Sequence, residues 1–306
     1  MVALFFTPIH FINMHTSKVK GYILAIISSA SFGLIPAFIL PVKQVSFSMD
    51  VTLFYRFFFS AIMLLGILFF RKENWRIKIR EVGILCILGL LYALSTELLF
   101  VGYDYLSAGI ASTIFFVYPM LVAIIMFFMY EEKLSGKGIL SLVLATLGVM
   151  VLSFNEGSFT FNFKGLGIVL LAALSYGLYI IIVNKARLKV SGFKLTFYSM
   201  FFTSLYYLIK AFIWGESLIL PKTEMYFNFA LFAFVTTVVS GLSLVYAIKH
   251  IGSTPTAILG ALEPIVAVLV SVISFGEHFS FNLAIGIVLI IVGVVLNILS
   301  AKSTHH

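Results

Sequence analysis

Three ionisable side chains lie inside long apolar stretches of this 306-residue chain: Arg56, Glu97 and Glu263. A charge at the centre of a bilayer costs about 2.5–3.5 kcal/mol, so such residues usually face a protein interior or a substrate path. A guanidinium can bind a carboxylate, and a carboxylate can bind an amine. The three residues therefore predict a site that recognises a small charged substrate or couples its movement to an ion.

Glu263 comes immediately before Pro264, near the middle of its apolar stretch. Proline has no amide hydrogen and disrupts the preceding helical turn, which frees backbone carbonyl groups. A carboxylate beside free carbonyl groups can bind a cation or an amine, or exchange a proton. We predict this role for Glu263; the alternative is a protonated, purely structural glutamate. The corresponding Pro119 follows Tyr118 instead, so both prolines predict kinks but only one has a charge beside it.

Arg56 lies about five residues from the outer end of span 2, and Glu97 lies about four residues from the outer end of span 3, so we expect them at similar depth in the membrane. At 1.5 Å per residue, this spacing predicts an Arg56–Glu97 ion pair. The pair would serve as an outer gate or as a recognition site for a zwitterion. The alternatives are a structural bridge, or an Arg56 side chain that extends to the membrane surface.

Tyrosines supply the second group of candidates, because a tyrosine can donate to a substrate and stack on a flat or cationic one. We expect them at cavity-facing positions: Tyr92, Tyr118, Tyr176, Tyr179 and Tyr246. For each of them, packing or anchoring at the membrane interface is the alternative.

The elements that must position these residues are membrane helices. The chain is 61% hydrophobic and only 10% charged, which a soluble surface could not accommodate. Long continuous apolar runs favour helices over barrel strands. We predict an all-α integral membrane protein with ten transmembrane helices, at roughly 21–40, 51–70, 83–101, 109–130, 137–154, 165–184, 195–214, 228–248, 254–275 and 281–300.

Basic residues predict the orientation. The large majority of the 20 Lys and Arg residues fall on the side of the N-terminus. The opposite side carries only a few lysines, namely Lys43, Lys164, Lys210 and Lys222. The positive-inside rule then places both termini in the cytoplasm of a multi-pass inner (cytoplasmic) membrane protein. The rule also accounts for the net charge of +8, so we expect no nucleic-acid partner.

The chain also repeats itself. Pro119 and Pro264 are each followed at equal spacing by a Glu, a Ser and a Gly, namely Glu132, Ser135 and Gly148, and Glu277, Ser280 and Gly293. The earlier parts of the repeats match at an offset of 144, as in Lys20-Gly21 and Lys164-Gly165. We predict an N-terminal cytoplasmic segment over 1–17 and five-helix repeats over 18–155 and 164–301. Because five is odd, the second repeat is inverted in the membrane.

This pattern resembles the drug/metabolite transporter superfamily, EamA type. The resemblance rests on the paired five-helix units, the Ala-Gly-Ile-Ala-Ser run at 108–112, the two prolines and the Glu-x-x-Ser turns. It implies a central cavity lined by spans 1–4 and 6–9, with spans 5 and 10 at the periphery. Phe32 and Tyr176 stand where many members of the superfamily have Trp.

We therefore expect a secondary transporter of small organic metabolites that works by alternating access, and the resemblance favours export of amino acids or related compounds. The alternatives are an importer, an exchanger of a nucleotide-like or other metabolite, or multidrug efflux. No hydrolase or metalloprotease motif occurs, and Cys86 is the single cysteine, so we expect no enzyme activity, no metal site and no cofactor. Small residues on spans 5 and 10 predict close packing there, either within one chain or in a homodimer.

Overall fold

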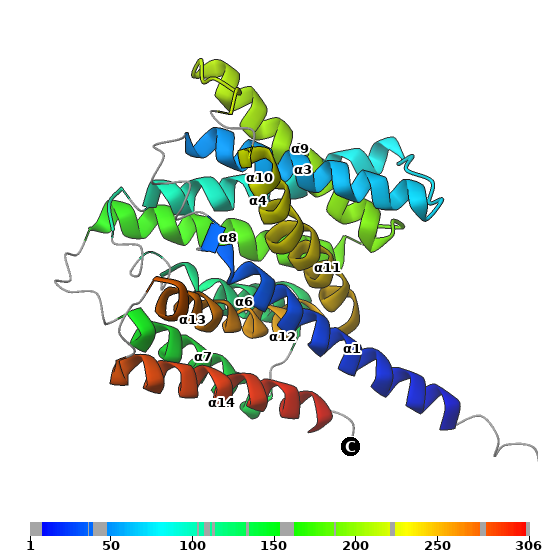
Figure 1. Cartoon of the computed structure of the whole chain (residues 1–306). Helices are drawn as coiled ribbons and strands as arrows, with labels where there is room; N and C mark the ends of the chain where they lie inside the picture. The colour runs from blue at the N-terminus through cyan, green and yellow to red at the C-terminus, as the bar shows by residue number, and fades with distance from the viewer. Residues whose placement is uncertain are drawn as a thin grey trace, which may run out of the picture.

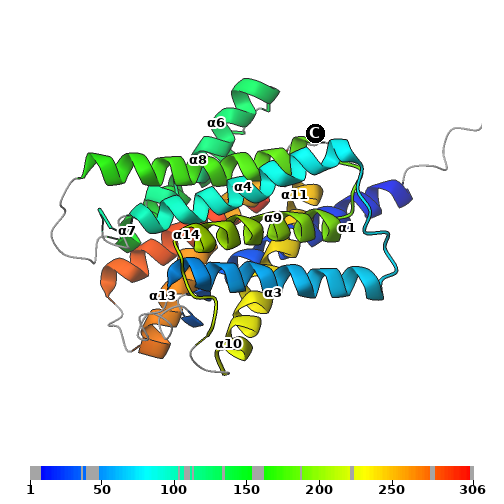
Figure 2. The same cartoon turned by 90° about the horizontal axis from the view of Figure 1, so that it is seen from above.

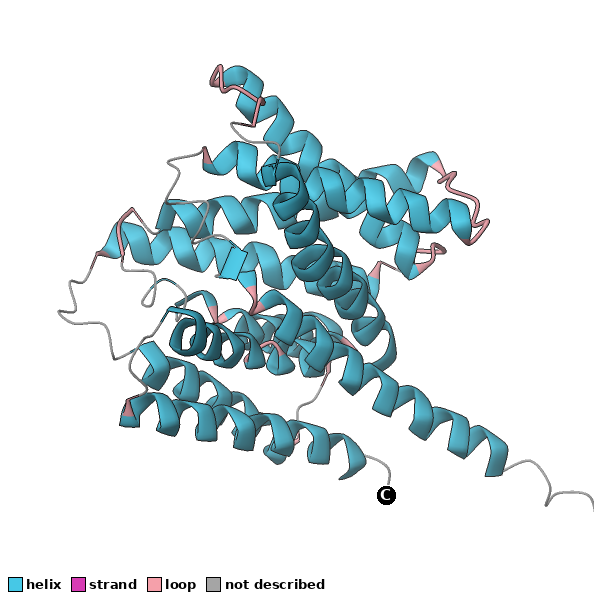
Figure 3. Cartoon of the chain, viewed as in Figure 1, coloured by secondary structure: helices cyan, strands magenta, loops and turns pink. Residues whose placement is uncertain are grey.

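The described part of the chain is helical throughout. The computed structural model describes residues 8–35, 37–38, 48–102, 104–106, 111, 114–132, 135–153, 162–186, 188–220, 224–275 and 280–303. Every regular element among these residues is a helix (Figure 3). Several residues used in the sequence comparison lie outside this part: Lys43, Lys222, Glu277 and most of 108–112.

These residues form ten helical segments in the order that the sequence predicts. The bounds are α1 Pro8–Phe32, α3 Met49–Phe70, α4 Ile79–Gly102, α6 Tyr118–Tyr130, α7 Gly136–Ser153, α8 Phe163–Lys185, α9 Gly192–Ile213, α10 Glu224–Ala233 with η1 Phe234–Val239 and α11 Ser240–Ile251, α12 Ser253–Leu259 with α13 Leu262–Phe275, and α14 Phe281–Ser303. Six of the segments have the length and apolar composition of a membrane span, and α6 and α7 are shorter apolar helices. The predicted ten-helix, all-α membrane fold is confirmed.

The main helix contacts join the two halves of the chain. α1 packs on α11, α3 on α9, α4 on α8, α7 on α14 and α6 on α12. Exchanging the halves turns the α1–α11 contact into the α4–α8 contact and maps each of the other three onto itself. The inverted repeat is thus built from contacts between the halves.

α7 and α14 form one edge of the bundle, with α3 and α9 on the far side of it (Figure 1). Gly148 and Gly293 let these two helices approach closely, because an added Cβ at Gly293 would lie 2.9 Å from the backbone oxygen of Ser141. The Ser141 hydroxyl donates to the Gly293 carbonyl at 2.7 Å. The small residues are therefore used within one chain, and a homodimer through α7 and α14 stays a prediction that would need their other faces.

Pro119 and Pro264, which occupy matching positions in the two repeats, lie at the beginnings of new helices and do not kink continuous ones. Pro119 lies in the first turn of α6, and Pro264 lies in the first turn of α13, which follows a turn at Gly260 and Ala261. The first amides of a helix have no partner within it, so proline sacrifices no hydrogen bond there. As a result Tyr118 and Glu263, the residues before the prolines, stand at the starts of half-helices.

The third irregular segment is the α10–η1–α11 span, where Phe234–Val239 form a π-helix. A π-helix carries one extra residue per turn and shifts the direction of the following side chains and carbonyl groups. It places Thr236 and Thr237 toward α3.

Packing of α7 on α14 gives the first prediction. Gly293→Ala should lower the unfolding free energy by about 1–3 kcal/mol, because its Cβ would meet backbone atoms. The detergent-purified variant should therefore have a lower melting temperature than the wild type. Gly66→Ala is the matched control, since a Cβ there has nothing within 4 Å. Both changes raise helix propensity, so equal melting temperatures would contradict the close packing.

Candidate functional site

Four of the predicted tyrosines form one cluster. Tyr92 comes from α4, Tyr118 from α6, and Tyr176 and Tyr179 from α8, and all four are buried. The ring centroids of Tyr118 and Tyr176 lie 4.9 Å apart, and those of Tyr92 and Tyr179 lie 5.2 Å apart. Both pairs meet edge to face, which is a favourable arrangement for aromatic rings. The cluster thus brings three helices from both halves to one place.

Arg56 of α3 is buried at the edge of this cluster, with only 2% of its surface exposed. Its Nε donates to the Thr237 hydroxyl at 2.8 Å, and a terminal nitrogen donates to the Thr236 carbonyl at 3.4 Å. The guanidinium also lies over the Phe232 ring, 4.8 Å from its centroid. The π-helix and the aromatic ring therefore hold the cation where lipid or bare helix could not.

The contacts to described residues engage two of the five N–H groups of Arg56. Phe32 and Phe57 add further ring contacts, at 5.4 and 5.3 Å from the guanidinium carbon. In the part of the chain that the structure describes, Arg56 forms no ion pair with a carboxylate. Among the described residues, Thr236 and Thr237 are the hydrogen-bond acceptors of this side chain.

Glu263 lies in the first turn of α13, where the helix dipole favours a negative charge. The side chain lies deep within the bundle but keeps part of its accessible surface. It interacts electrostatically with Arg56, Tyr118 and Tyr176. Arg56 and Glu263 therefore lie within electrostatic range of one another without a direct ion pair.

Two glycines make room for this arrangement. A Cβ at Gly260 would overlap the hydroxyl of Tyr118, which donates to the Ala257 carbonyl at 3.3 Å. A Cβ at Gly33, which follows α1, would lie 2.6 Å from the carbonyl oxygen of Glu263. Close backbone approach at both points sets the position of the two half-helix starts.

The family assignment follows from the whole chain as well as from the site. The EamA-like transporter family matches twice, over residues 19–154 and 163–299. This chain belongs to the EamA-like transporter family. The predicted resemblance is thereby confirmed, and the chain is a member of a family of small-molecule transporters.

Relatives of this EamA-like transporter are similar over most of their length. An uncharacterized transporter of Clostridium kluyveri is 24% identical over 262 residues, which make up 81% of this chain and 83% of the relative. The uncharacterized transporter YvbV of Bacillus subtilis is 26% identical over 227 residues, or 74% of this chain and 72% of the relative. A solved structure titled "Crystal structure of protein" has a TM-score of 0.79 at 15% identity, covers 95% of this chain and 98% of its own, and supports the fold alone.

In this EamA-like transporter, Glu97 lies away from Arg56, so the predicted Arg56–Glu97 pair is wrong. Glu97 binds Lys210 of α9 in a short ion pair, and Lys210 also binds Asp50 at 2.9 Å. The shared lysine places Glu97 beside Asp50 in the first turn of α3, whereas Arg56 lies further along that helix. The sequence does not indicate which side chains of neighbouring apolar helices face one another.

Tyr246 also lies outside the cluster. It packs on Gly192 and on the Phe193 ring, 5.7 Å between centroids, at the start of α9. This is the end of the bundle formed by residues 71–78 and 188–191, called the basic end below. Residue 48 and residues 214–220 form the opposite end. The structure thus brings six candidates together and separates Glu97 and Tyr246 from them.

Nothing in the sequence connects Arg56 with the residues that support it, although Phe32 is noted above for another reason. They are Phe32, Phe57, Phe232, Thr236 and Thr237. The only available signal was the Thr-Thr pair within an apolar stretch, because a π-helix has no sequence signature of the kind that marks a cap or a turn.

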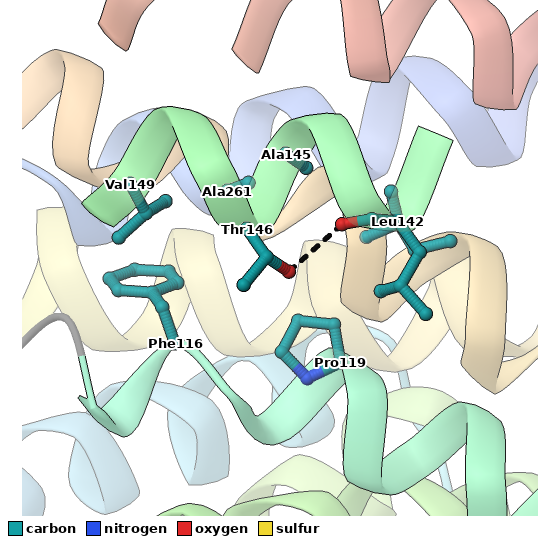
Figure 4. Close-up of a pocket in the computed structure, with 8 residues that line it drawn as sticks. Phe116, Pro119, Leu142, Ala145, Thr146, Val149 and Ala261 are labelled. Carbon is teal, nitrogen blue, oxygen red and sulfur yellow. Dashed lines mark hydrogen bonds between the residues drawn. The ribbon is translucent and has the colours of Figure 1, made fainter. Parts of the chain in front are cut away.

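A small pocket lies beside the helix breaks rather than in the cluster (Figure 4). Phe116 and Pro119 line it from span 4, and Ile258 and Ala261 line it from span 9. Its one side-chain hydroxyl, that of Thr146, already donates to the Leu142 carbonyl at 2.8 Å. The pocket is therefore apolar and offers nothing that would bind a charged substrate.

At the basic end, Glu73 connects the α3–α4 loop to α9. The Ser191 hydroxyl donates to Glu73 at 2.6 Å, and Arg71 lies 3.2 Å from the other carboxylate oxygen. The hydrogen bond from Ser191, with the charges of Arg71 and Lys194, holds the pKa of Glu73 below its ordinary value, although burial opposes this shift. Tyr246 is a further neighbouring titratable group.

This depressed pKa gives a second prediction. The stabilisation from Glu73 should be complete above the pKa of the unfolded chain, about 4.3, and should be lost as the pH falls through the lower folded value. Melting curves of the wild type and of Glu73→Gln between about pH 7 and pH 3 test this. The wild-type advantage should be constant down to about pH 4.5 and shrink below it. An advantage that is unchanged at the acid end, or equally large for the exposed Asp104→Asn control, would contradict the assignment.

Proposed function

We propose that this protein exports amino acids or related zwitterionic metabolites by alternating access. The observation that carries the proposal is the placement of Arg56 and Glu263, which border one tyrosine cluster with opposite charges and without a direct ion pair. Among the described residues, neither side chain forms an ion pair. Ionised groups without partners are costly in an apolar bundle, and a zwitterion between the two side chains would satisfy both.

In this proposal Arg56 binds the carboxylate of the substrate through the N–H groups that Thr236 and Thr237 leave free. Glu263 binds the ammonium group, and it takes up a proton when the substrate leaves. The tyrosine rings pack on the side chain of the substrate, which favours apolar or aromatic side chains. The half-helix starts at Tyr118 and Glu263 resemble the discontinuous helices that transporters use at their binding sites.

We further propose that the protein lies in the cytoplasmic membrane with both termini inside the cell. Basic residues at or next to the basic end, including Arg71, Arg76 and Lys194, support this orientation through the positive-inside rule. Transport from this end to the opposite end is then export. Import, exchange of a nucleotide-like compound and multidrug efflux are the other outcomes that a substrate screen would reveal.

Counterflow in proteoliposomes tests the proposal. Vesicles preloaded with an amino acid should accumulate the labelled compound in a saturable manner, and Glu263→Gln should abolish this uptake while the protein still inserts and folds. Glu97→Gln is the matched control, because it makes the same chemical change at a carboxylate outside the tyrosine cluster and should keep most of the activity. Full activity of Glu263→Gln would refute the role of this residue.

The role of Arg56 is tested by substrate pairs. Arg56→Gln should weaken transport of an amino acid by roughly tenfold or more, since a charge-assisted hydrogen bond to the carboxylate is lost. Transport of the corresponding decarboxylated amine should change much less. Equal losses for both compounds would mean that Arg56 is structural and does not bind the carboxylate.

A further inference from the structure

The antiparallel helices α3 and α9 are joined at both ends by the same side-chain hydrogen bond. At the basic end the Ser191 hydroxyl donates to Glu73 Oε2 at 2.6 Å. At the opposite end the Ser48 hydroxyl donates to Glu216 Oε2, also at 2.6 Å. Each bond joins one half of the chain to the other.

A tyrosine repeats the connection at each end. The Tyr198 hydroxyl donates to the Trp75 carbonyl at 2.7 Å, next to the Ser191–Glu73 bond. The Tyr55 hydroxyl donates to the Leu218 carbonyl at 2.6 Å, next to the Ser48–Glu216 bond. We call the first set of two bonds the basic-end clasp and the second set the opposite-end clasp.

The two clasps are related by the inverted repeat, because each of the four residues of one clasp has a counterpart in the other clasp at a separation of 143 positions. The pairs are Ser48 and Ser191, Tyr55 and Tyr198, Glu73 and Glu216, and Trp75 and Leu218. The structure thus corrects the alignment of these two helices by one residue, since the sequence comparison gave an offset of 144 for the earlier parts of the repeats.

Local backbone structure explains the recurrence. Each serine is the N-cap of its helix, and each glutamate follows the C-terminal end of the partner helix. Lys72 and Gly215, which precede the glutamates, have φ of 53° and 66°. This left-handed residue turns the chain back so that the amide of Glu73 bonds to the Leu68 carbonyl at 3.0 Å and that of Glu216 to the Ala211 carbonyl at 2.9 Å.

α3 and α9 pack against one another, and Figure 2 shows them running side by side. When one half rocks against the other, two such helices must separate at one end while they stay together at the other. The basic-end clasp and the opposite-end clasp lie at the two ends of this helix pair, where the separation would take place. Their matched chemistry makes breaking either of them cost a similar free energy.

We propose that the Ser191–Glu73 and Ser48–Glu216 clasps are the alternating gates of this transporter, and that the balance between them sets which end opens. The proposal rests on transport by alternating access, as proposed above. The four residues position the helices and do not contact the substrate. The surroundings bias the balance: Arg71 supports the basic-end clasp, while Lys210 and Asp50 add an ion pair at the opposite end.

Distances between spin labels test the proposal without any substrate, so its failure is distinguishable from failure of the proposed function. One label pair at Lys78→Cys and Lys189→Cys reports on the basic end, and a second at Asp104→Cys and Ser217→Cys reports on the opposite end, both in a Cys86→Ser protein that is first shown to fold. Glu73→Gln with Ser191→Ala should raise the population of long distances at the basic end by roughly tenfold and leave the opposite end closed.

Glu216→Gln with Ser48→Ala should give the reciprocal result. Ser191→Thr, which keeps the hydroxyl, should restore the wild-type distances. Removing both clasps together should bring the ratio of the two open states back toward the wild-type value, which a merely structural role would not produce. Distances that do not change, or that lengthen at both ends in each single-clasp variant, would overturn the proposal.

Discussion

A guanidinium buried within an apolar bundle is the constraint on which the rest of this structure depends. Arg56 cannot remain there without acceptors, and the two that it contacts belong to the π-helix of the other half. Both acceptors lie in the same irregular turn, so the position of Arg56 depends on the π-helix. The same cation acts on Glu263 and the tyrosines, so one interaction links the shape of a helix to the electrostatics of the site.

Composition and spacing were sufficient to predict the fold, because lipid requires complete apolar helices and the paired prolines mark the duplication. Six of the eight candidate side chains lie in or beside the tyrosine cluster, and their role in transport stays a prediction. The separate positions of Glu97 and Tyr246 could not be predicted, since in a stretch that is apolar all round no periodicity indicates which face is inward. The acceptor groups of Arg56 depend on backbone irregularity, and this is set by tertiary packing.

The two halves of the chain differ in sequence at the proposed substrate site and match at the ends of α3 and α9, where movement is proposed. By the helix alignment, Arg56 corresponds to Ser199, and by the proline alignment, Glu263 corresponds to Tyr118. Both charged residues therefore have an uncharged counterpart in the other copy, and both border the tyrosine cluster. The serines, tyrosines and glutamates at the ends of α3 and α9 occur in both copies. The two copies thus share the contacts at the ends of these helices, whereas the charged residues beside the tyrosine cluster differ between them.

The pairing of each helix with one from the other half has a consequence for how the protein is made. During synthesis the first five helices enter the membrane before any of their main partners exists. Arg56 then lacks the acceptors of span 8, and the small face of α7 lacks α14. The first half therefore lies in the bilayer without its main helix contacts. Arg56 and α7 gain their partners only when segments more than a hundred residues further along the chain are inserted.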